Sequence, residues 1–193
     1  MEPLFICASS SPRRKEILDF FTMPFTVQKP PFDEKSVTYQ GNILSYVKKI
    51  AEGKALSLSS QLPTLSSDTV VYLEGKVYEK PRDDKDALAC LAELNGKWHT
   101  VFTALSISYK GELFTEIEKT EVCFHKLDSE HLRRYHDLFQ HNDKAGSYAI
   151  QKAGSMIVKE IKGCFYNVMG MPIHTLQIVL KKIGIDLWDY IPS

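Results

Sequence analysis

Apolar and polar positions along this chain change period several times, and the changes predict strands that alternate with helices. Leu4–Ala8 and Phe25–Gln28 are short apolar runs typical of strands. Residues 12–21 and 42–60 instead carry apolar side chains at helical spacing. The order of these segments favours the α/β fold class.

The same patterns continue through the rest of the chain. Thr64–Tyr72 predicts a further strand, followed by a hairpin about Glu74-Gly75, where glycine supplies a positive φ. The later predicted elements are a helix from residue 83 or 84 to Leu94, two long antiparallel strands within residues 97–127 that turn at Lys110-Gly111, a helix capped by Asp128, a strand over Met156–Ile161, and a helix over Ile173–Ile183.

Length and charge limit the classes of protein that fit. A chain of 193 residues suits one α/β domain, or one domain with two lobes. Its 24 basic and 24 acidic side chains give a formal charge of zero, which argues against a broad surface for nucleic acid. Any site for an anion must therefore be a local concentration of positive charge.

Cysteine usage and hydropathy predict the compartment. The four cysteines are scattered and form no Cys-x-x-Cys pair, so we expect small buried side chains in a reducing environment. Neither a signal peptide nor an apolar stretch long enough to span a bilayer is expected. These observations predict a cytoplasmic protein that does not enter a membrane.

The first candidate site is the segment from Ser9 to Lys15. Ser11 suits the N-cap of a helix, and Pro12 suits its first position. Three cations follow at a helix end that disfavours positive charge and binds anions readily. The segment predicts a polyphosphate site, with equal weight given to a capped helix start that carries solvated arginines.

Three acidic residues and one lysine form the next candidates. Asp68 interrupts a run of strand-forming residues, which indicates either a functional site or the cap of a turn. Asp33 and Glu34 fit a solvated loop, with a metal site or a cationic pocket as the alternative. Lys54 lies on an amphipathic helix, and its position alone favours an ordinary solvent-facing lysine.

A third stretch, residues 143–151, combines small residues with a lysine and a glutamine. Glycine there would let a ligand approach the backbone, and the amide of Gln151 could contact a base edge or lie on a surface strand. Lys80 stands just before a predicted helix. His131, His136 and His141 lack the spacing of a metal site, and we expect them on the surface.

Together and in this order, the motifs resemble those of the Maf nucleoside-triphosphate pyrophosphatases over nearly the full chain. The motifs are Ser9-x-Ser11-Pro12-Arg13-Arg14, Asp33-Glu34, Lys54-Ala55, Asp68-Thr69-Val70-Val71, Lys80-Pro81, Leu94-x-Gly96 with Val101 and Thr103, Lys144-Ala145-Gly146-x-Tyr148-x-Ile150-Gln151, and Val168-x-Gly170-x-Pro172.

The resemblance implies a fold and an activity. The expected fold is an elongated mixed sheet with flanking helices and a cleft between two lobes, similar to inosine-triphosphate pyrophosphatases, with residues 1–193 forming a single domain. The expected reaction is hydrolysis of dTTP and UTP to the monophosphate and diphosphate by a homodimer that uses Mg²⁺ or Mn²⁺. The family is also associated with inhibition of septum formation, so the alternative is a nucleotide-binding regulator that acts without turnover.

Family roles carry over to single positions. The resemblance implies that Asp68 is the proton acceptor that activates water. It also implies that Glu34 lies near the metal or the reacting phosphate, with Glu34 and Asp68 as the metal ligands. The resemblance also implies that serine, arginine and lysine side chains bind the phosphates. These residues are Ser9, Arg13, Arg14, Lys54 and Lys80.

Nucleotide preference is implied by three further matches, Arg13, Thr69 and Gln151, which agree with the dTTP/UTP branch and differ from the 7-methyl-GTP branch. Ser67 and Ser147 replace the family's usual alanines. The second change bears on base selectivity, whereas Ser67 is expected not to touch the chemistry.

Overall fold

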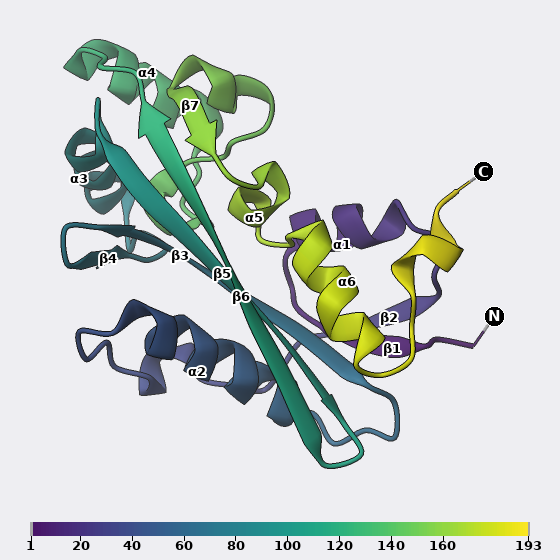
Figure 1. Ribbon diagram of the computed structural model, residues 1–193. Coiled ribbons are helices and arrows are strands. Elements are labelled where there is room, and N and C mark those ends of the chain that lie inside the picture. Colours follow the sequence, from purple (N-terminus) through teal and green to yellow (C-terminus); the bar gives the residue numbers. More distant parts are fainter. Residues whose placement is uncertain (1, 193) are drawn as a thin grey trace. The chain divides into compact units, whose positions relative to one another are not determined.

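A computed structural model describes residues 2–192. Over these residues a seven-stranded mixed sheet has the order β2-β1-β3-β5-β6-β7, with β4 paired to β3, and helices flank it (Figure 1). The predicted mixed α/β fold is confirmed.

The strands are β1 (Phe5–Ala8), β2 (Phe25–Gln28), β3 (Thr64–Leu73), β4 (Lys76–Tyr78), β5 (Trp98–Tyr109), β6 (Glu112–Phe124) and β7 (Val158–Lys162). The α-helices are α1 (Pro12–Asp19), α2 (Ile43–Leu56), α3 (Asp84–Leu94), α4 (Ser129–Phe139), α5 (Phe165–Met169) and α6 (Ile173–Lys181), with 3₁₀ turns η1 (Glu34–Ser36), η2 (Ala145–Ser147), η3 (Lys152–Met156) and η4 (Leu187–Tyr190).

The chain divides into two compact units. Unit 1 contains the residues up to Asp68, Thr103–Glu118, and the residues from Gly170 onward. Unit 2 contains Thr69–Phe102 and Lys119–Met169. Each unit is described by itself below, and the single domain with a cleft between two lobes stays a prediction.

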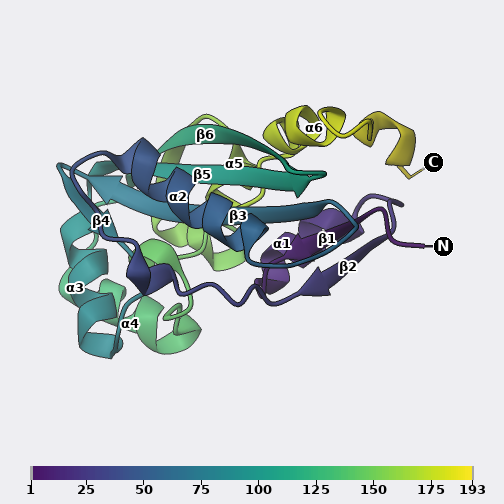
Figure 2. The same ribbon diagram turned by 90° about the horizontal axis from the view of Figure 1, so that it is seen from below.

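Unit 1 is built on three parallel strands. β1 pairs with β2 in the register Phe5↔Phe25 and with β3 in the register Ile6↔Thr64. Because parallel connections are right-handed, the connection from β1 to β2 places α1 on one face, and the return to β3 places α2 on the other. Figures 1 and 2 show α1 and α2 on opposite sides of these strands. Buried apolar side chains in this unit include Phe5, Leu18, Val47, Leu65 and Leu180.

Unit 2 begins with the predicted hairpin. β3 and β4 are antiparallel, and the turn between them has φ values of 49° at Glu74 and 88° at Gly75. Two successive positive φ values are the geometry of a type I′ turn, whose twist matches that of a hairpin.

The helices of unit 2 start where the sequence indicates. The side chains of Asp83 and Asp128 accept hydrogen bonds from backbone N–H groups in the first turns of α3 and α4. Both helices contribute to a core with the strands, made of Val71, Leu73, Tyr78, Leu91, Leu94, Val101, Val122, Phe124, Leu132, Tyr135, Tyr148 and Ile157.

Two expectations for unit 2 are wrong. Residues 152–156 form a 3₁₀ turn, so the strand expected from Met156 begins at Val158 instead. His136 is buried, not exposed, and its Nε2 lies 3.2 Å from Oδ1 of Asp84. His136 faces inward because α4 packs against α3, a contact that the helical period does not specify.

Candidate functional site

The centre of the site in unit 1 is an ion pair between Lys54 and Asp68. Lys54 comes from α2 and Asp68 from β3, and 2.7 Å separates Nζ from Oδ1. Only 7% of the lysine side chain and 8% of the aspartate side chain are exposed. The solvent-facing lysine and the turn-capping aspartate are therefore both excluded, and β3 passes through Asp68 without a break.

Glu34 brings a second carboxylate to the same ammonium group. Its Oε1 lies 3.0 Å from Nζ of Lys54, and 44% of its side chain is exposed. Asp33 shapes this segment by accepting a hydrogen bond from the backbone N–H of Lys35. Lys54 therefore contacts two carboxylates that lie 34 residues apart in the sequence, one buried and one at the surface.

The buried pair is accompanied by Arg14. Its Nη1 donates to the carbonyl oxygen of Ser67 at 2.8 Å and to Oγ of Ser9 at 3.3 Å, while its Nε donates to the carbonyl oxygen of Gly170 at 3.0 Å. Burial lowers the pKa of the Arg14 guanidinium, and the negative charge of Asp68 opposes that shift. Arg14 thus fixes the start of α1 against the residue that precedes Asp68.

Ser67 has a structural contact in this arrangement, and its expected lack of a role in the chemistry stays a prediction. Its Oγ donates to the carbonyl oxygen of Gly170 at 2.7 Å, the same oxygen that accepts from Arg14. Ser67 is 1% exposed. The resemblance described above marked Ser67 as a departure from alanine, but the sequence did not indicate its partner.

The start of α1 differs in detail from the expected cap. Ser11 occupies the N-cap position and Pro12 the first helical position, but the side chain of Ser11 makes no capping hydrogen bond. Oγ of Ser9 accepts from the backbone N–H of Ser11 at 3.2 Å instead. Ser9 is thereby oriented by both the loop and Arg14.

Unit 1 therefore brings together five of the predicted site residues, which are Ser9, Arg14, Glu34, Lys54 and Asp68. Arg13 is partly buried beside Arg14. A carboxylate in such a group can accept a proton from water, and the neighbouring cations and N–H groups can neutralise phosphate oxygens.

Thr69, Lys80 and Gln151 belong to unit 2. Lys80 is exposed, and the adjoining carbonyl of Glu79 accepts a hydrogen bond of 3.4 Å from the backbone N–H of Gly146. The segment before Gln151 therefore lies beside the segment of Lys80. Oε1 of Gln151 is buried without a hydrogen-bond partner among the described residues, which leaves an acceptor for a ligand donor.

Glu34 and Asp68 are the residues that could hold a divalent cation. No group of three or more His, Cys, Asp or Glu side chains within residues 2–192 could hold a metal ion by itself. Mg²⁺ typically takes one or two protein carboxylates and fills its other positions with water and substrate phosphates. Two carboxylates on one ammonium group fit a metal that arrives with a polyphosphate, and such a metal would neutralise developing charge.

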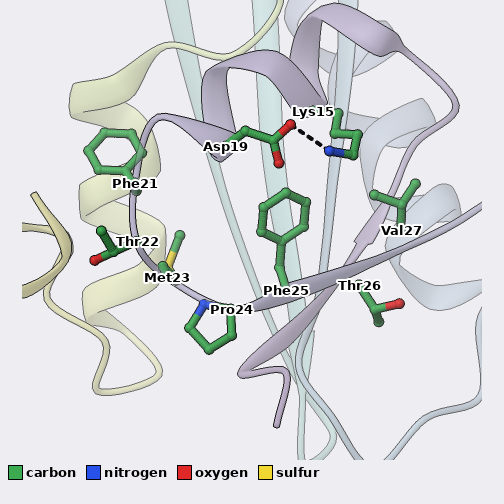
Figure 3. Close-up of a pocket in the computed structure, with 9 residues that line it drawn as sticks. All are labelled: Lys15, Asp19, Phe21, Thr22, Met23, Pro24, Phe25, Thr26 and Val27. Atoms are coloured by element: carbon green, nitrogen blue, oxygen red, sulfur yellow. Dashed lines mark hydrogen bonds and ion pairs between the residues drawn. The ribbon is translucent and has the colours of Figure 1, made fainter. Parts of the chain in front are cut away.

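A separate pocket lies between α1 and β2 in unit 1. It has a volume of about 430 Å³ and includes Lys15, Asp19 and Phe25 in its lining. Figure 3 shows the ring of Phe25 below the ion pair of Lys15 and Asp19, in which Nζ and Oδ2 are 2.5 Å apart. Of the candidate segments identified from the sequence, this pocket includes Lys15, the last residue of the Ser9–Lys15 segment.

Comparison with known families adds evidence independent of the geometry. A family model described as "Maf-like protein" matches residues 4–183. The chain belongs to the Maf family. Family membership agrees with the site in unit 1, where the hydroxyl–Pro–Arg–Arg and Asp-Thr-Val-Val motifs supply Ser9, Arg14 and Asp68.

Similar proteins in the family have named activities. A Chlamydia felis protein named dTTP/UTP pyrophosphatase is 43% identical over 99% of this chain and all of its own length. A Clostridium perfringens protein of the same name is 39% identical over 94% of this chain and 98% of its own length. Among solved structures, the Ham1 protein of Staphylococcus aureus aligns with a TM-score of 0.43 and 16% identity, covering 65% of this chain and 72% of its own.

Proposed function

We propose that this Maf family member is a nucleoside triphosphate pyrophosphatase that hydrolyses dTTP and UTP to the monophosphate and diphosphate. The observation that carries the proposal is the Asp68 carboxylate, buried in β3 beside Lys54 and Arg14. Full-length relatives named dTTP/UTP pyrophosphatase support the same reaction.

The proposed chemistry is attack of water on the phosphoanhydride between the α and β phosphates. Asp68 accepts a proton from the water, one P–O bond forms, and the bond to the leaving diphosphate breaks. Cationic side chains and backbone N–H groups stabilise charge on the phosphate oxygens. In unit 1 these groups are Lys54, Arg14 and the loop around Ser9, and in unit 2 we assign the same task to Lys80.

A divalent cation, Mg²⁺ or Mn²⁺, completes the proposed site. The support is the pair of carboxylates, Glu34 and Asp68, because oxygen ligands suit both ions. When bound, the ion would neutralise part of the negative charge of the triphosphate.

Preference for pyrimidine nucleotides is assigned to Arg13, Thr69 and Gln151. The unpartnered amide oxygen of Gln151 supports a contact with a donor on the base. The test is a panel of dTTP, UTP, dATP, GTP and 7-methyl-GTP assayed side by side, in which dTTP and UTP should give the highest kcat/KM. A higher value for 7-methyl-GTP would contradict the specificity and leave the reaction type intact.

We also propose a cytoplasmic homodimer. All four cysteines are free thiols, which suits a reducing compartment. No helix among residues 2–192 is long and apolar enough to cross a membrane. Light scattering of the purified protein tests the dimer, because a monomer mass at micromolar concentration would contradict it.

The decisive experiment compares wild type with Asp68→Asn in the release of diphosphate from dTTP with Mg²⁺ or Mn²⁺. Loss of a general base should lower kcat about 10²- to 10⁴-fold. Asp19→Asn is the matched control, because Asp19 forms an exposed ion pair with Lys15 in the same unit and its removal should leave kcat unchanged.

Two results would count against the proposal in different ways. Absence of diphosphate release by wild type would reject the activity. Equal turnover by wild type and Asp68→Asn would reject only the role of Asp68.

A further inference from the structure

Lys54 contacts the two carboxylates of unit 1 that are the proposed ligands of a divalent cation. Its Nζ lies 3.0 Å from Oε1 of Glu34 and 2.7 Å from Oδ1 of Asp68. These are the same two carboxylates that could ligate a metal. An ammonium group and a metal ion cannot both bind closely to the same carboxylate oxygens without strong repulsion.

We propose that Lys54 is an internal counter-cation that keeps metal affinity low until a triphosphate binds, so that the metal enters together with the nucleotide. This inference rests on the proposed function only for the requirement for metal. It assigns Lys54 a second role, beyond contact with the triphosphate.

Burial makes this role effective. Only 7% of the Lys54 side chain and 8% of the Asp68 side chain are exposed, so neither can exchange its partner for water at low cost. Three segments distant in sequence, η1, α2 and β3, supply the three groups. The ammonium group therefore stays between the carboxylates while no stronger anion is present.

The charges of the site give the same conclusion. Glu34 and Asp68 contribute two negative charges, and Lys54, Arg14 and the neighbouring Arg13 contribute three positive charges, so these five groups carry a net charge of about +1. A divalent cation entering alone would raise this uncompensated positive charge in a partly buried site. A triphosphate brings the missing negative charge.

The triphosphate also offers Lys54 an alternative partner. Phosphate oxygens accept charge-assisted hydrogen bonds from lysine, as carboxylate oxygens do. When Nζ turns to a phosphate oxygen, the oxygens of Glu34 and Asp68 become available to the metal. The ammonium group and the metal thus exchange partners as the nucleotide binds.

The experiment measures Mn²⁺ binding to nucleotide-free protein by electron paramagnetic resonance of the free ion. Lys54→Gln removes the cation and keeps a hydrogen-bond donor, and it should bind one Mn²⁺ per chain at least about tenfold more tightly than wild type. Lys54→Arg keeps the charge and should bind as weakly as wild type.

Two further variants locate the effect. Lys48→Gln is the matched control, because Lys48 lies on the same helix in an exposed pair with Glu52 and should leave Mn²⁺ affinity unchanged. The double variant Lys54→Gln/Asp68→Asn should lose the added affinity, since it removes a ligand. Retention of tight binding in the double variant would overturn the proposal by placing the ion elsewhere.

Wild type alone also decides the question if Lys54→Gln fails to fold, which circular dichroism would reveal. Half-saturation of nucleotide-free wild type above about 0.1 mM Mn²⁺ supports the proposal, and tighter binding at Asp68 overturns it. A folded Lys54→Gln with no gain in affinity overturns it as well. Diphosphate release from dTTP by wild type is scored separately, so the proposed function can hold while this inference fails.

Discussion

Arg14 is a charged residue whose side chain forms hydrogen bonds with backbone carbonyl groups inside unit 1. It donates hydrogen bonds to the carbonyl oxygens of Ser67 and Gly170 through different nitrogens of its planar fork. A lysine has the charge but a single donor group with different geometry. The resemblance implies phosphate contact for Arg14, and the structure adds a positioning contact next to Asp68.

We predict that Arg14→Lys lowers the free energy of unfolding by about 1–3 kcal/mol, because it leaves a partly buried carbonyl without a donor. Urea unfolding at pH 7 measures the change. Arg134→Lys, at an exposed arginine, is the matched control and should cost less than half as much. An equal loss from both substitutions would show that the contacts of Arg14 do not matter for stability.

His99 is a second residue whose environment has a measurable consequence. It is 2% exposed, and its Nε2 lies 2.9 Å from the hydroxyl of Tyr148 in unit 2. Burial lowers the pKa of His99 from 6.5 to about 4. Between these two values the unfolded chain binds a proton that the folded chain does not, so the folded state loses stability as the pH falls.

From this shift we expect the free energy of unfolding to drop by about 2 kcal/mol between pH 7 and pH 5 through His99 alone. Urea unfolding of wild type and His99→Gln at both values isolates the contribution, since the variant should lack it. His174→Gln serves as the control at an exposed histidine and should behave as wild type. An identical pH dependence in wild type and His99→Gln would contradict the assignment.

At the scale of elements, helix α2 packs closely against the segment around Phe32, and the contact is made at Gly53. Gly53 lies within α2, where glycine is unfavourable, and a Cβ there would come within 2.3 Å of the ring of Phe32. Because Gly53 has no side chain, the ring of Phe32 can pack against α2 at this position. Phe32 lies two residues before Glu34 in the sequence. A glycine inside a helical pattern weakens the helix, and the sequence does not identify the side chain that lies against it.

We predict that Gly53→Ala lowers kcat/KM for dTTP about tenfold, because the ring and the segment that carries Glu34 must move away from Lys54. The melting temperature should change little, since a gain in helix propensity of up to about 1 kcal/mol offsets the lost contact. Lys49→Ala, an exposed change in the same helix, should leave kcat/KM unchanged. An unaltered kcat/KM in Gly53→Ala would mean that Phe32 does not position Glu34.

Element positions were the most predictable part of the fold. The hairpin turn at Glu74-Gly75 and the caps Asp83 and Asp128 occur as expected, because backbone geometry and capping are decided by neighbouring residues. The strand expected from Met156 starts later, because an apolar run alone does not separate a 3₁₀ turn from a strand.

At the scale of the whole molecule, the numbers of acidic and basic side chains are equal. Positive charge at the site must therefore come from the side chains nearby and not from the net charge of the chain. A net charge of zero gives no long-range attraction for a triphosphate. In the proposed function, binding depends on the cations near Asp68. Salt weakens the attraction between such cations and an incoming anion.

We therefore expect KM for dTTP to rise several-fold between about 50 and 500 mM NaCl while kcat changes less, because screening acts mainly on binding. Initial rates at fixed free Mg²⁺ measure this, and thermal melting over the same range checks that the fold persists. A KM independent of salt would indicate that binding does not rely on partly exposed cations.

The sequence by itself determined most of the helices and strands, the family and the identity of the chemical groups. These follow from local backbone preferences and from motifs a few residues long, such as the run from Ser9 to Arg14 and the block from Asp68 to Val71.

Only the tertiary structure decided which of these groups meet. Hydrophobic period tells which side of a helix is buried, and it does not tell which partner lies there. Lys54 is buried because α2 packs on a face of β3 at Asp68. Ser67 donates a hydrogen bond to the carbonyl oxygen of Gly170, a residue more than 100 positions later in the sequence. Contacts at such separation depend on the packing of whole elements, so no local pattern in the chain could have specified them.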